Sequence, residues 1–169
     1  MSKTVWTFTN QKELDKSQFI NYVERKVFRT IRKHNMLAKT ATSHKPQATS
    51  HVITLKKSDD LNTAILKKII ETKFEVKFST KPNMSSQNLS QSAEDIFKNI
   101  LKGNFKEQLP NNAPLAQLSD KELELYAKLT NTKGVKRKQD KKIQNLFAKF
   151  LKKNQDLELN IVKAIGQIK

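Results

Sequence analysis

The first strong pattern in the chain is an apolar stripe at helical spacing between residues 15 and 34. The stripe consists of Phe19, Ile20, Val23, Val27 and Ile31. Positions that recur at i, i+3 and i+4 share one side of a helix, so the spacing predicts an amphipathic helix. The residues before it, around Val5, Trp6 and Phe8, are either a short strand or an ordered arm.

Residues 51–78 have the pattern of a strand, a turn, a helix and a second strand. The β-branched run at 52–55 leads through a polar turn into a segment with apolar residues at helical spacing, namely Leu61, Ala64, Ile65 and Ile69. Residues 74–78 alternate between apolar and polar, which is typical of a half-buried strand. Polar segments flank this unit: 37–50 predicts a linker and 79–91 predicts a mobile loop.

The second half of the chain predicts helices joined by a connection at 104–118. The helix at 92–102 has N-cap candidates at 90–92, Glu94 and Asp95 for its first turn, and Gly103 as its stop. The helix at 119–129 opens with a capping box of Ser119 and Glu122. Two further stripes predict packed helices, and they are Ile143, Leu146, Phe147, Phe150 and Leu151, then Leu159, Ile161, Val162 and Ile165.

These elements predict a small α/β layer in which helices dominate. We expect three parts: an N-terminal arm and basic helix at 1–36, a linker at 37–50, and a reduced α/β domain with basic C-terminal helices at 51–169. Hydrophobic residues make up only 36% of the 169 residues, so the predicted core is small. Low hydrophobicity and long polar loops also favour a protein that is ordered by a partner.

The charge of the chain points to a polyanionic partner. Lys and Arg total 33 against 16 Asp and Glu, which gives +17 and a pI near 10.0. Such an excess is typical of nucleic-acid binding, although a general surface bias toward lysine is the alternative. The absence of cysteine excludes disulfides and thiolate metal sites, and no apolar segment predicts a signal region or membrane span. We expect a cytoplasmic protein with no membrane partner.

Two basic clusters are the candidate RNA-binding sites. One lies on the first predicted helix and consists of Arg25, Lys26, Arg29, Arg32 and Lys33. The other consists of Lys133, Lys136, Arg137, Lys138, Lys141 and Lys142. Several cations within reach of successive phosphates are what an RNA backbone requires, and a solvated helix face is the alternative. The second cluster also resembles a nuclear-type basic signal.

Catalysis has no support from the residues themselves. His34, His44 and His51 are too scattered for a metal site, and no nucleophile or paired-carboxylate arrangement is present. We therefore expect no metal, no cofactor and no enzymatic activity. Tyr22 and Tyr126 sit at helical positions where packing is the commoner role, whereas Trp6 is expected to be exposed and available to stack on a base.

Three segments, in order, resemble the PP-loop ATPases that thiolate tRNA uridines. FINYVERKVFRTIRKHNML at 19–37 is similar to the basic helix before the family's nucleotide-binding strand. NLSQSAEDIFKNILKGNF at 88–105 is similar to a segment with asparagine, leucine and two aspartates before an apolar helix. The C-terminal part of the chain is similar in its Pro-Leu turn, its acidic helix ending in Tyr-Ala and its two last apolar segments, at 114–129 and 140–168.

The resemblance implies a reduced, helix-dominated remnant of a PP-loop domain of the adenine nucleotide alpha hydrolase-like type. The family's Ser-Gly-Gly-Lys-Asp-Ser loop falls on residues 55–60, where Lys56, Lys57 and Ser58 depart from it and Asp59 alone matches. Its glycines let the backbone approach pyrophosphate, so lysines there imply a degenerate nucleotide loop. Ser90 and Gln91 replace the acidic pair, and the cysteines that carry the family's cluster and sulfur chemistry are missing.

Three hypotheses follow for function. The first is a non-catalytic protein that binds tRNA or rRNA through backbone phosphates, within a ribonucleoprotein or beside a larger partner such as an active PP-loop paralogue. The second is a divergent ATP-dependent tRNA-modifying enzyme, or its accessory subunit, that uses Lys56, Lys57 and Asp59. The third is a structural ribosome-associated protein whose resemblance records only ancestry.

Overall fold

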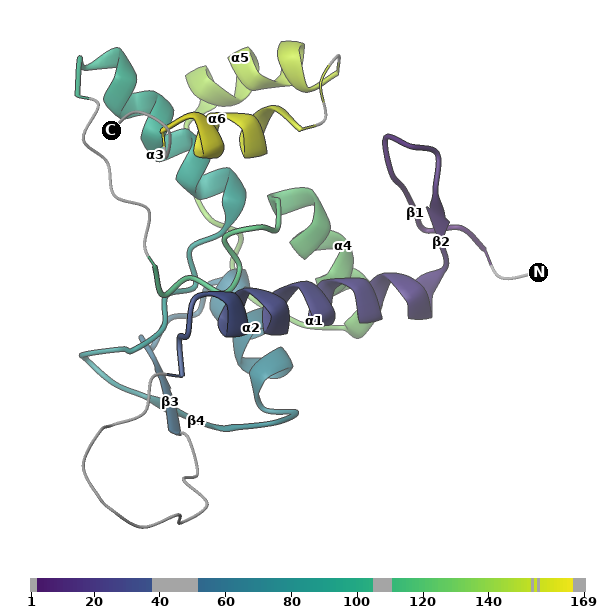
Figure 1. Ribbon diagram of the computed structural model, residues 1–169, viewed down its shortest axis with the longest axis vertical. Helices are drawn as coiled ribbons and strands as arrows, with labels where there is room; N and C mark the ends of the chain where they lie inside the picture. The colour runs from purple at the N-terminus through teal and green to yellow at the C-terminus, as the bar shows by residue number, and fades with distance from the viewer. Residues whose placement is uncertain (1–2, 38–51, 105–110, 153, 155, 166–169) are drawn as a thin grey trace.

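The computed structural model describes residues 3–37, 52–104, 111–152, 154 and 156–165 (Figure 1). Helices provide most of this structure, and the strands are short. The elements in chain order are β1 (Trp6–Thr7), β2 (Glu13–Leu14), α1 (Lys16–Lys33), β3 (Val52–Leu55), α2 (Leu61–Ile70), β4 (Glu75–Phe78), α3 (Leu89–Leu101), α4 (Asp120–Thr130), α5 (Lys141–Leu151) and α6 (Leu157–Ile165). The expectation of a mixed α/β protein dominated by helices is confirmed.

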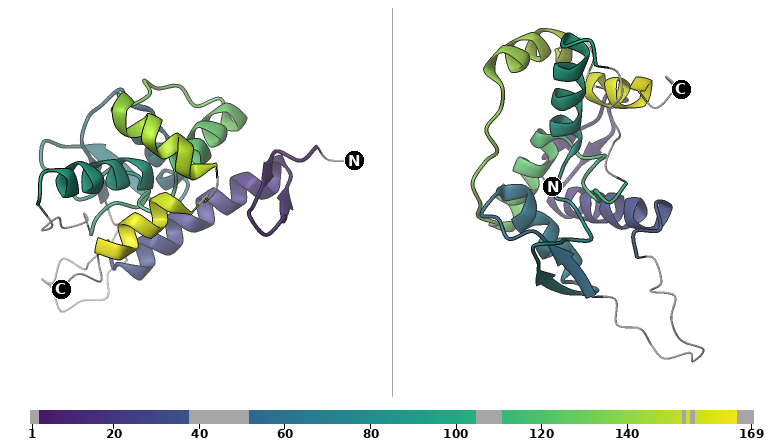
Figure 2. Two further views of the ribbon diagram at one scale, coloured as in Figure 1. Left: turned by 90° about the horizontal axis from the view of Figure 1, so that it is seen from above. Right: turned by 90° about the vertical axis from the view of Figure 1, so that its left-hand side faces the viewer.

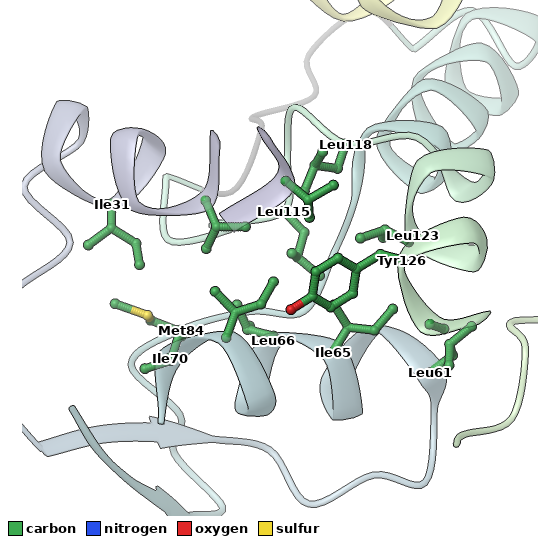
Figure 3. Close-up of a cluster of buried hydrophobic side chains, with 14 of the residues drawn as sticks. Ile31, Leu61, Ile65, Leu66, Ile70, Met84, Leu115, Leu118, Leu123 and Tyr126 are labelled. Atoms are coloured by element: carbon green, nitrogen blue, oxygen red, sulfur yellow. The ribbon is translucent and has the colours of Figure 1, made fainter. Parts of the chain in front are cut away.

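The predicted first helix is α1, and its apolar stripe faces the core. Asp15 and Gln18 form a capping box at its start, and His34 follows its last residue. Phe19, Val23 and Val27 are fully buried. They belong to a main cluster in which α1, α2 and α4 meet (Figure 3), so α1 is part of the same core as β3 and α2.

The strand–helix–strand unit is present as predicted. β3 and β4 pair in parallel, with Val52 opposite Glu75 and Leu55 opposite Phe78, and α2 connects them. Ile53 and Leu55 are buried, whereas Phe78 is 46% exposed and Lys67 lies over its ring. β1 and β2 form a separate antiparallel hairpin.

A second, smaller cluster joins α3, α5 and α6 at the upper end of the molecule (Figure 1). Its buried residues are Ala93, Ile143 and Phe147. The prediction that the whole α5 stripe is buried is wrong, because Leu146 and Phe150 are 38% and 54% exposed. The cluster is too narrow to cover more than one edge of α5.

The α6 helix is also buried less than its pattern predicts. Leu159, Ile161 and Val162 are half-buried, and the side chain of Ile165 lies outside the described residues. Glu158 is instead the buried residue of this helix. A polar partner on α3 makes that position tolerable, and sequence periodicity gives no sign of it.

The prediction of a mobile loop at 79–91 is wrong. Met84 is 1% exposed, and the Asn83 carboxamide oxygen accepts a 2.8 Å hydrogen bond from the Thr54 amide of β3. Asn88 caps α3 by accepting from the Gln91 amide, so the helix begins at Leu89 instead of residue 92. Consequently Glu94 and Asp95 lie beyond its first turn, while Gly103 ends it as expected, with a φ of +73°.

Trp6 is not the exposed aromatic residue that we expected. Its ring is half-buried and packs on Phe19 and Phe8, with ring centroids 5.4 and 6.4 Å apart. The β1–β2 hairpin turns it toward α1, which covers part of its ring.

The predicted linker at 37–50 lies, apart from Leu37, outside the described residues, and the division into three parts stays a prediction. Among the residues that the structure describes, no helix has the length and apolar character needed to cross a membrane.

Candidate nucleic-acid interface

The turn between β3 and α2 exposes the residues predicted as a degenerate nucleotide loop. Lys56, Lys57, Ser58 and Asp59 are all exposed. The turn leads directly into α2, so an anion bound there would meet the positive end of the helix dipole. Whether phosphate can approach depends on what the first turn of α2 already contacts.

Groups of the protein itself occupy that first turn. The Asp60 carboxylate accepts hydrogen bonds from the Thr63 amide and the Thr63 hydroxyl, both at 2.8 Å. The Leu61 amide donates to the Val135 carbonyl at 2.8 Å. An N-cap carboxylate holds the position that a phosphate takes at such a helix end, and its charge repels one.

The segment after α4 packs closely against the same helix end. The Val135 amide donates to the Asp59 carbonyl at 2.8 Å, which gives an isolated parallel bridge between Asp60 and Val135. At Gly134 an added Cβ would lie 2.6 Å from the Leu61 Cα, a distance that no side chain tolerates. Glycine is therefore required at this position for close backbone approach.

A groove with lysines on its walls opens beside this contact. It has a volume of about 610 Å³ and is lined by Lys121, Lys128, Lys133 and Lys136, with Glu124 among them. Leu61, Leu125 and Ala127 give it apolar surface. We call it the lysine groove. Its four lysines and one glutamate leave a charge of +3.

The predicted cluster on α1 divides into exposed and paired residues. Arg25, Arg29, Arg32 and Lys33 are exposed. Lys26 is half-buried, and its ammonium group lies 3.2 Å from the Glu122 carboxylate and 2.6 Å from the Tyr22 hydroxyl. Burial and the neighbouring Glu122 raise the pKa of Tyr22 far above its ordinary value, so this hydroxyl stays protonated. Lys26 thus helps to join α1 to α4.

The two predicted basic clusters lie on opposite sides of the molecule. α1 runs along one side of the layer formed by α2 and α4, and the segment that links α4 to α5 runs along the other (Figures 1 and 2). The structure therefore brings together residues 56–59 and 133–136, through the contact of Asp59 with Val135, and separates both from the basic face of α1.

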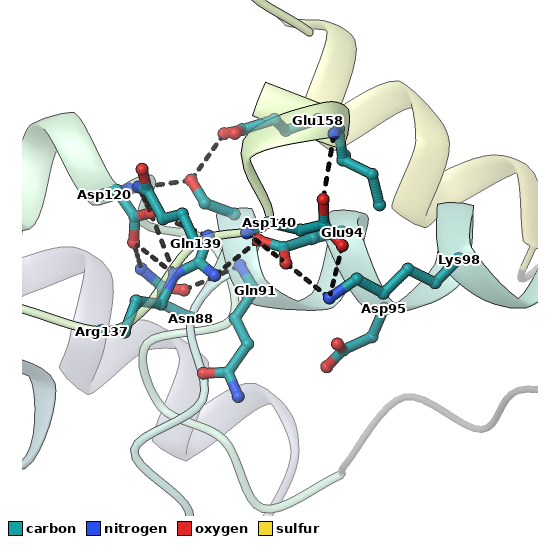
Figure 4. Close-up of polar contacts among 12 residues, drawn as sticks. Asn88, Gln91, Glu94, Asp95, Lys98, Asp120, Arg137, Gln139, Asp140 and Glu158 are labelled. Carbon is teal, nitrogen blue, oxygen red and sulfur yellow. Dashed lines mark hydrogen bonds and ion pairs between the residues drawn. The ribbon is translucent and has the colours of Figure 1, made fainter. Parts of the chain in front are cut away.

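Arg137 belongs to a polar network that joins α3, α4 and the segment before α5 (Figure 4). Its guanidinium is 2.6 Å from the Glu94 carboxylate of α3 and 2.9 Å from the Asp120 carboxylate of α4. The side-chain Nδ2 of Asn88 also donates to the Asp120 carboxylate, at 2.6 Å. Arg137 is thus held by two carboxylates, while Lys138, Lys141 and Lys142 beyond it are exposed.

The carboxylates of this network have opposite electrostatic environments. Burial tends to raise the pKa of Glu94, but hydrogen bonds from Lys98 and Arg137 outweigh it, so the net pKa is lowered. Burial also raises the pKa of Glu158, and the single hydrogen bond from the Ser90 hydroxyl does not compensate for it. Within the described residues no group of three His, Asp or Glu side chains is arranged to hold a metal ion.

Sequence reasoning missed two members of the lysine groove. Lys121 and Lys128 lie one heptad apart on α4, with Glu124 and Leu125 between them at helical spacing. That spacing places all four residues on one face of the helix, and it is the sequence pattern that indicates this wall of the groove. The capping box of Ser119 and Glu122 predicts only a short helix here, and it carries no sign of the basic face.

Comparison with known proteins supports the fold alone. No protein-family model matches the chain, and no curated protein sequence is significantly similar to it. Its structure is similar to the U34-tRNA thiolase NcsA from Methanococcus maripaludis, determined with its [4Fe-4S] cluster. The TM-score is 0.69 at 12% sequence identity, and the match covers 98% of this chain and 84% of the thiolase chain. The chain thus has a PP-loop tRNA-thiolase-like fold.

Proposed function

We propose that this protein is a non-catalytic RNA-binding protein that uses a PP-loop tRNA-thiolase-like fold to hold tRNA by its backbone phosphates. The observation that carries the proposal is the closed first turn of α2. A PP-loop would offer free backbone amides to pyrophosphate at this point. Here Asp60 caps the helix, and the Val135 carbonyl accepts a hydrogen bond from the Leu61 amide. No cofactor is required by this function.

The supporting argument from chemistry is the contrast between phosphate binding by backbone and by lysine. A nucleotide loop depends on glycines and free N–H groups, and this turn has lysines at both glycine positions. Exposed lysines nevertheless attract phosphates as point charges, without demanding one backbone geometry. The turn has lost phosphate binding by its backbone but has kept attraction of phosphate by its lysines. This combination favours RNA binding over nucleotide hydrolysis.

The fold of the neighbour supports tRNA as the class of RNA. The similar chain is a thiolase that acts on U34 of tRNA, and the fold match covers nearly the whole of the present chain. A net charge of +17 supplies the long-range attraction that backbone binding needs. We propose that the protein works in the cytoplasm, either with an active PP-loop paralogue or in a ribonucleoprotein such as the ribosome.

A divergent tRNA-modifying enzyme is the second candidate, because the structural neighbour is an enzyme and Lys56, Lys57 and Asp59 are all exposed beside α2. In that case ATP stabilises the protein against heat, and Asp59→Asn removes the effect. The RNA-binding proposal predicts that ATP and magnesium shift the melting temperature of neither the wild-type protein nor the Asp59→Asn variant.

Fluorescence anisotropy with labelled tRNA, measured over a series of salt concentrations, tests the proposal together with the nucleotide melts. We expect binding that weakens linearly in a plot of log affinity against log salt, as counterion release requires. An rRNA hairpin of equal length serves as the comparison. Absence of tRNA binding at low salt overturns the proposal, and a melting shift that depends on Asp59 favours the enzyme.

A further inference from the structure

We infer that the RNA backbone binds in the lysine groove and not on the basic face of α1. The inference rests on the proposed function and adds the binding surface to it. It assigns direct phosphate contacts to Lys121, Lys128 and Lys133, of which only Lys133 belongs to the basic clusters in the sequence. The partner is one strand of an RNA phosphodiester backbone.

The shape of the groove favours a bound anion over a solvated surface. Its lysines come from both sides, since Lys121 and Lys128 project from α4 and Lys133 and Lys136 from the segment that follows it. Charges of one sign along a concave surface with apolar walls concentrate the electrostatic potential, because less water screens them. The apolar walls here are Leu61, Leu125 and Ala127.

The groove is also held in one geometry before any ligand binds. Val135 is hydrogen-bonded on both sides, to the Asp59 carbonyl and the Leu61 amide, and Gly134 fits against Leu61 without room for a side chain. The Lys68 ammonium donates to the Thr130 carbonyl at 2.6 Å, which fixes the end of α4 to α2. A preorganised site loses less conformational entropy on binding than a flexible one.

The exposed turn at 56–59 adjoins the segment that forms one wall of the groove. Val135 adjoins Asp59 through its amide, so Lys56 and Lys57 lie on the segment next to the groove wall. This extends the row of cations beyond the groove itself. Successive phosphates of one strand can therefore meet successive lysines, as backbone binding requires.

One acidic side chain competes with phosphate inside the groove. The Glu124 carboxylate lies 2.7 Å from the Lys136 ammonium, and both side chains are largely exposed, at 41% and 67%. Such surface ion pairs contribute little stability, so a phosphate can replace the carboxylate. Glu124 therefore lowers the affinity of the groove for RNA without being needed for the fold.

The basic face of α1 offers a weaker arrangement. Arg25, Arg29 and Arg32 follow one helix at spacings of three and four residues, so they form a single row on a convex surface. These three arginines come from a single element, whereas the lysines of the groove converge from α4 and from the segment that follows it. Their role is general attraction of RNA.

Two variants of equal net charge distinguish the lysine groove from the basic face of α1 as the RNA-binding surface. The groove variant is Lys121→Gln, Lys128→Gln and Lys133→Gln, and the matched control is Arg25→Gln, Arg29→Gln and Arg32→Gln. Each lowers the net charge by three, and none of the six side chains forms an ion pair with another residue that the structure describes. Thermal melting checks that both variants remain folded, and tRNA binding is then measured by anisotropy from about 50 to 200 mM salt.

We expect the groove variant to bind tRNA about tenfold or more weakly, with its salt slope reduced by about two to three, since each of the three lost phosphate contacts lowers the slope by about 0.7 to 0.9. The control variant should keep most of the wild-type slope. Equal losses in both variants, or a larger loss in the control, overturn the groove assignment while leaving RNA binding intact. If wild-type protein binds no tRNA, the proposed function itself fails.

Glu124→Gln gives an independent test with the opposite sign. Removal of the competing carboxylate should strengthen tRNA binding about two- to fivefold at low salt, because one anion no longer faces the phosphates. Glu75→Gln, which removes an exposed carboxylate paired with Lys77 on β4, is the matched control and should change affinity less. Equal changes in the two variants contradict a specific role for the groove.

Discussion

Glu158 is a buried carboxylate whose surroundings disfavour its charged form. It is 8% exposed, and one hydrogen bond of 2.9 Å from the Ser90 hydroxyl is its partner in α3. Burial raises the pKa of Glu158 above the ordinary value of 4.5, since its charged form loses hydration. The folded state therefore binds this proton more tightly than the unfolded state does.

Glu158→Gln should make the protein melt at a higher temperature at neutral pH. A raised folded-state pKa gives a stabilising contribution that is complete below pH 4.5 and is lost as the pH rises through the folded-state pKa. Glutamine removes that loss and still accepts the Ser90 hydrogen bond through its amide oxygen. Melting curves from pH 4 to pH 8 should show the variant's advantage growing with pH.

Glu94→Gln is the control, and its effect should have the opposite sign. Hydrogen bonds from Lys98 and Arg137 outweigh the effect of burial and lower the pKa of Glu94, so its contribution is present above pH 4.5 and disappears as the pH falls through the folded-state pKa. The Glu94 variant should be less stable at neutral pH, with a deficit that shrinks in acid. A Glu158 variant that is destabilised at neutral pH would contradict the account.

At the scale of secondary-structure elements, periodicity predicted where helices form, and local hydrogen bonds decided where they begin. The stripe of α1 and the Ser119–Glu122 capping box of α4 both appear as expected. The sequence places the start of α3 three residues too late. Asn88 stands among serines at 85, 86 and 90, so it resembles part of a polar loop. Asn88 is fully buried, and its value as a cap depends on Asp120, which is distant in sequence.

Asp60 caps α2, the helix that follows the predicted degenerate nucleotide loop. Asp60→Ala removes the cap of α2 and should lower the free energy of unfolding by about 1 kcal/mol, the usual loss for an N-cap. Asp60→Ser keeps an oxygen that can accept from the Thr63 amide, so it should lose less. Urea denaturation followed by circular dichroism measures both.

The same two variants report on the nucleotide loop. Without its cap the protein still lacks the glycine turn, so ATP should leave the melting temperature of the Asp60→Ala protein unchanged. A clear ATP-dependent stabilisation of the Asp60→Ala protein would mean that one carboxylate alone closes the site. That result would favour the divergent-enzyme interpretation.

For the molecule as a whole, the arrangement of surfaces was beyond the reach of sequence patterns. The composition predicted a polyanion binder, but it could not place the two basic clusters on opposite sides of the α2–α4 layer (Figure 2). Nor could it show that Lys26 and Arg137 are paired with buried carboxylates, because Glu122 and Glu94 lie far from them in the sequence. Tertiary contacts separate the cations that hold the fold from those that remain accessible.

The unequal size of the two hydrophobic clusters predicts that the molecule opens in parts. Eighteen buried side chains form the described main cluster, whereas three form the cluster of α3, α5 and α6. Because apolar burial is the main source of stability, amides of α5 should exchange with deuterium faster than those of α2. Hydrogen exchange followed by mass spectrometry at neutral pH measures this difference directly.

Phe147→Ala should sharpen this contrast. Phe147 is 2% exposed and packs against Phe97, so its truncation leaves a cavity in a cluster too small to absorb one. We expect faster exchange in α5 and α6 with little change in α1 and α2, whereas Ile65→Ala in the main cluster should accelerate exchange throughout the chain. Uniform acceleration by Phe147→Ala would show instead that the Arg137 network couples the two clusters into one cooperative unit, since that network is the polar connection between them.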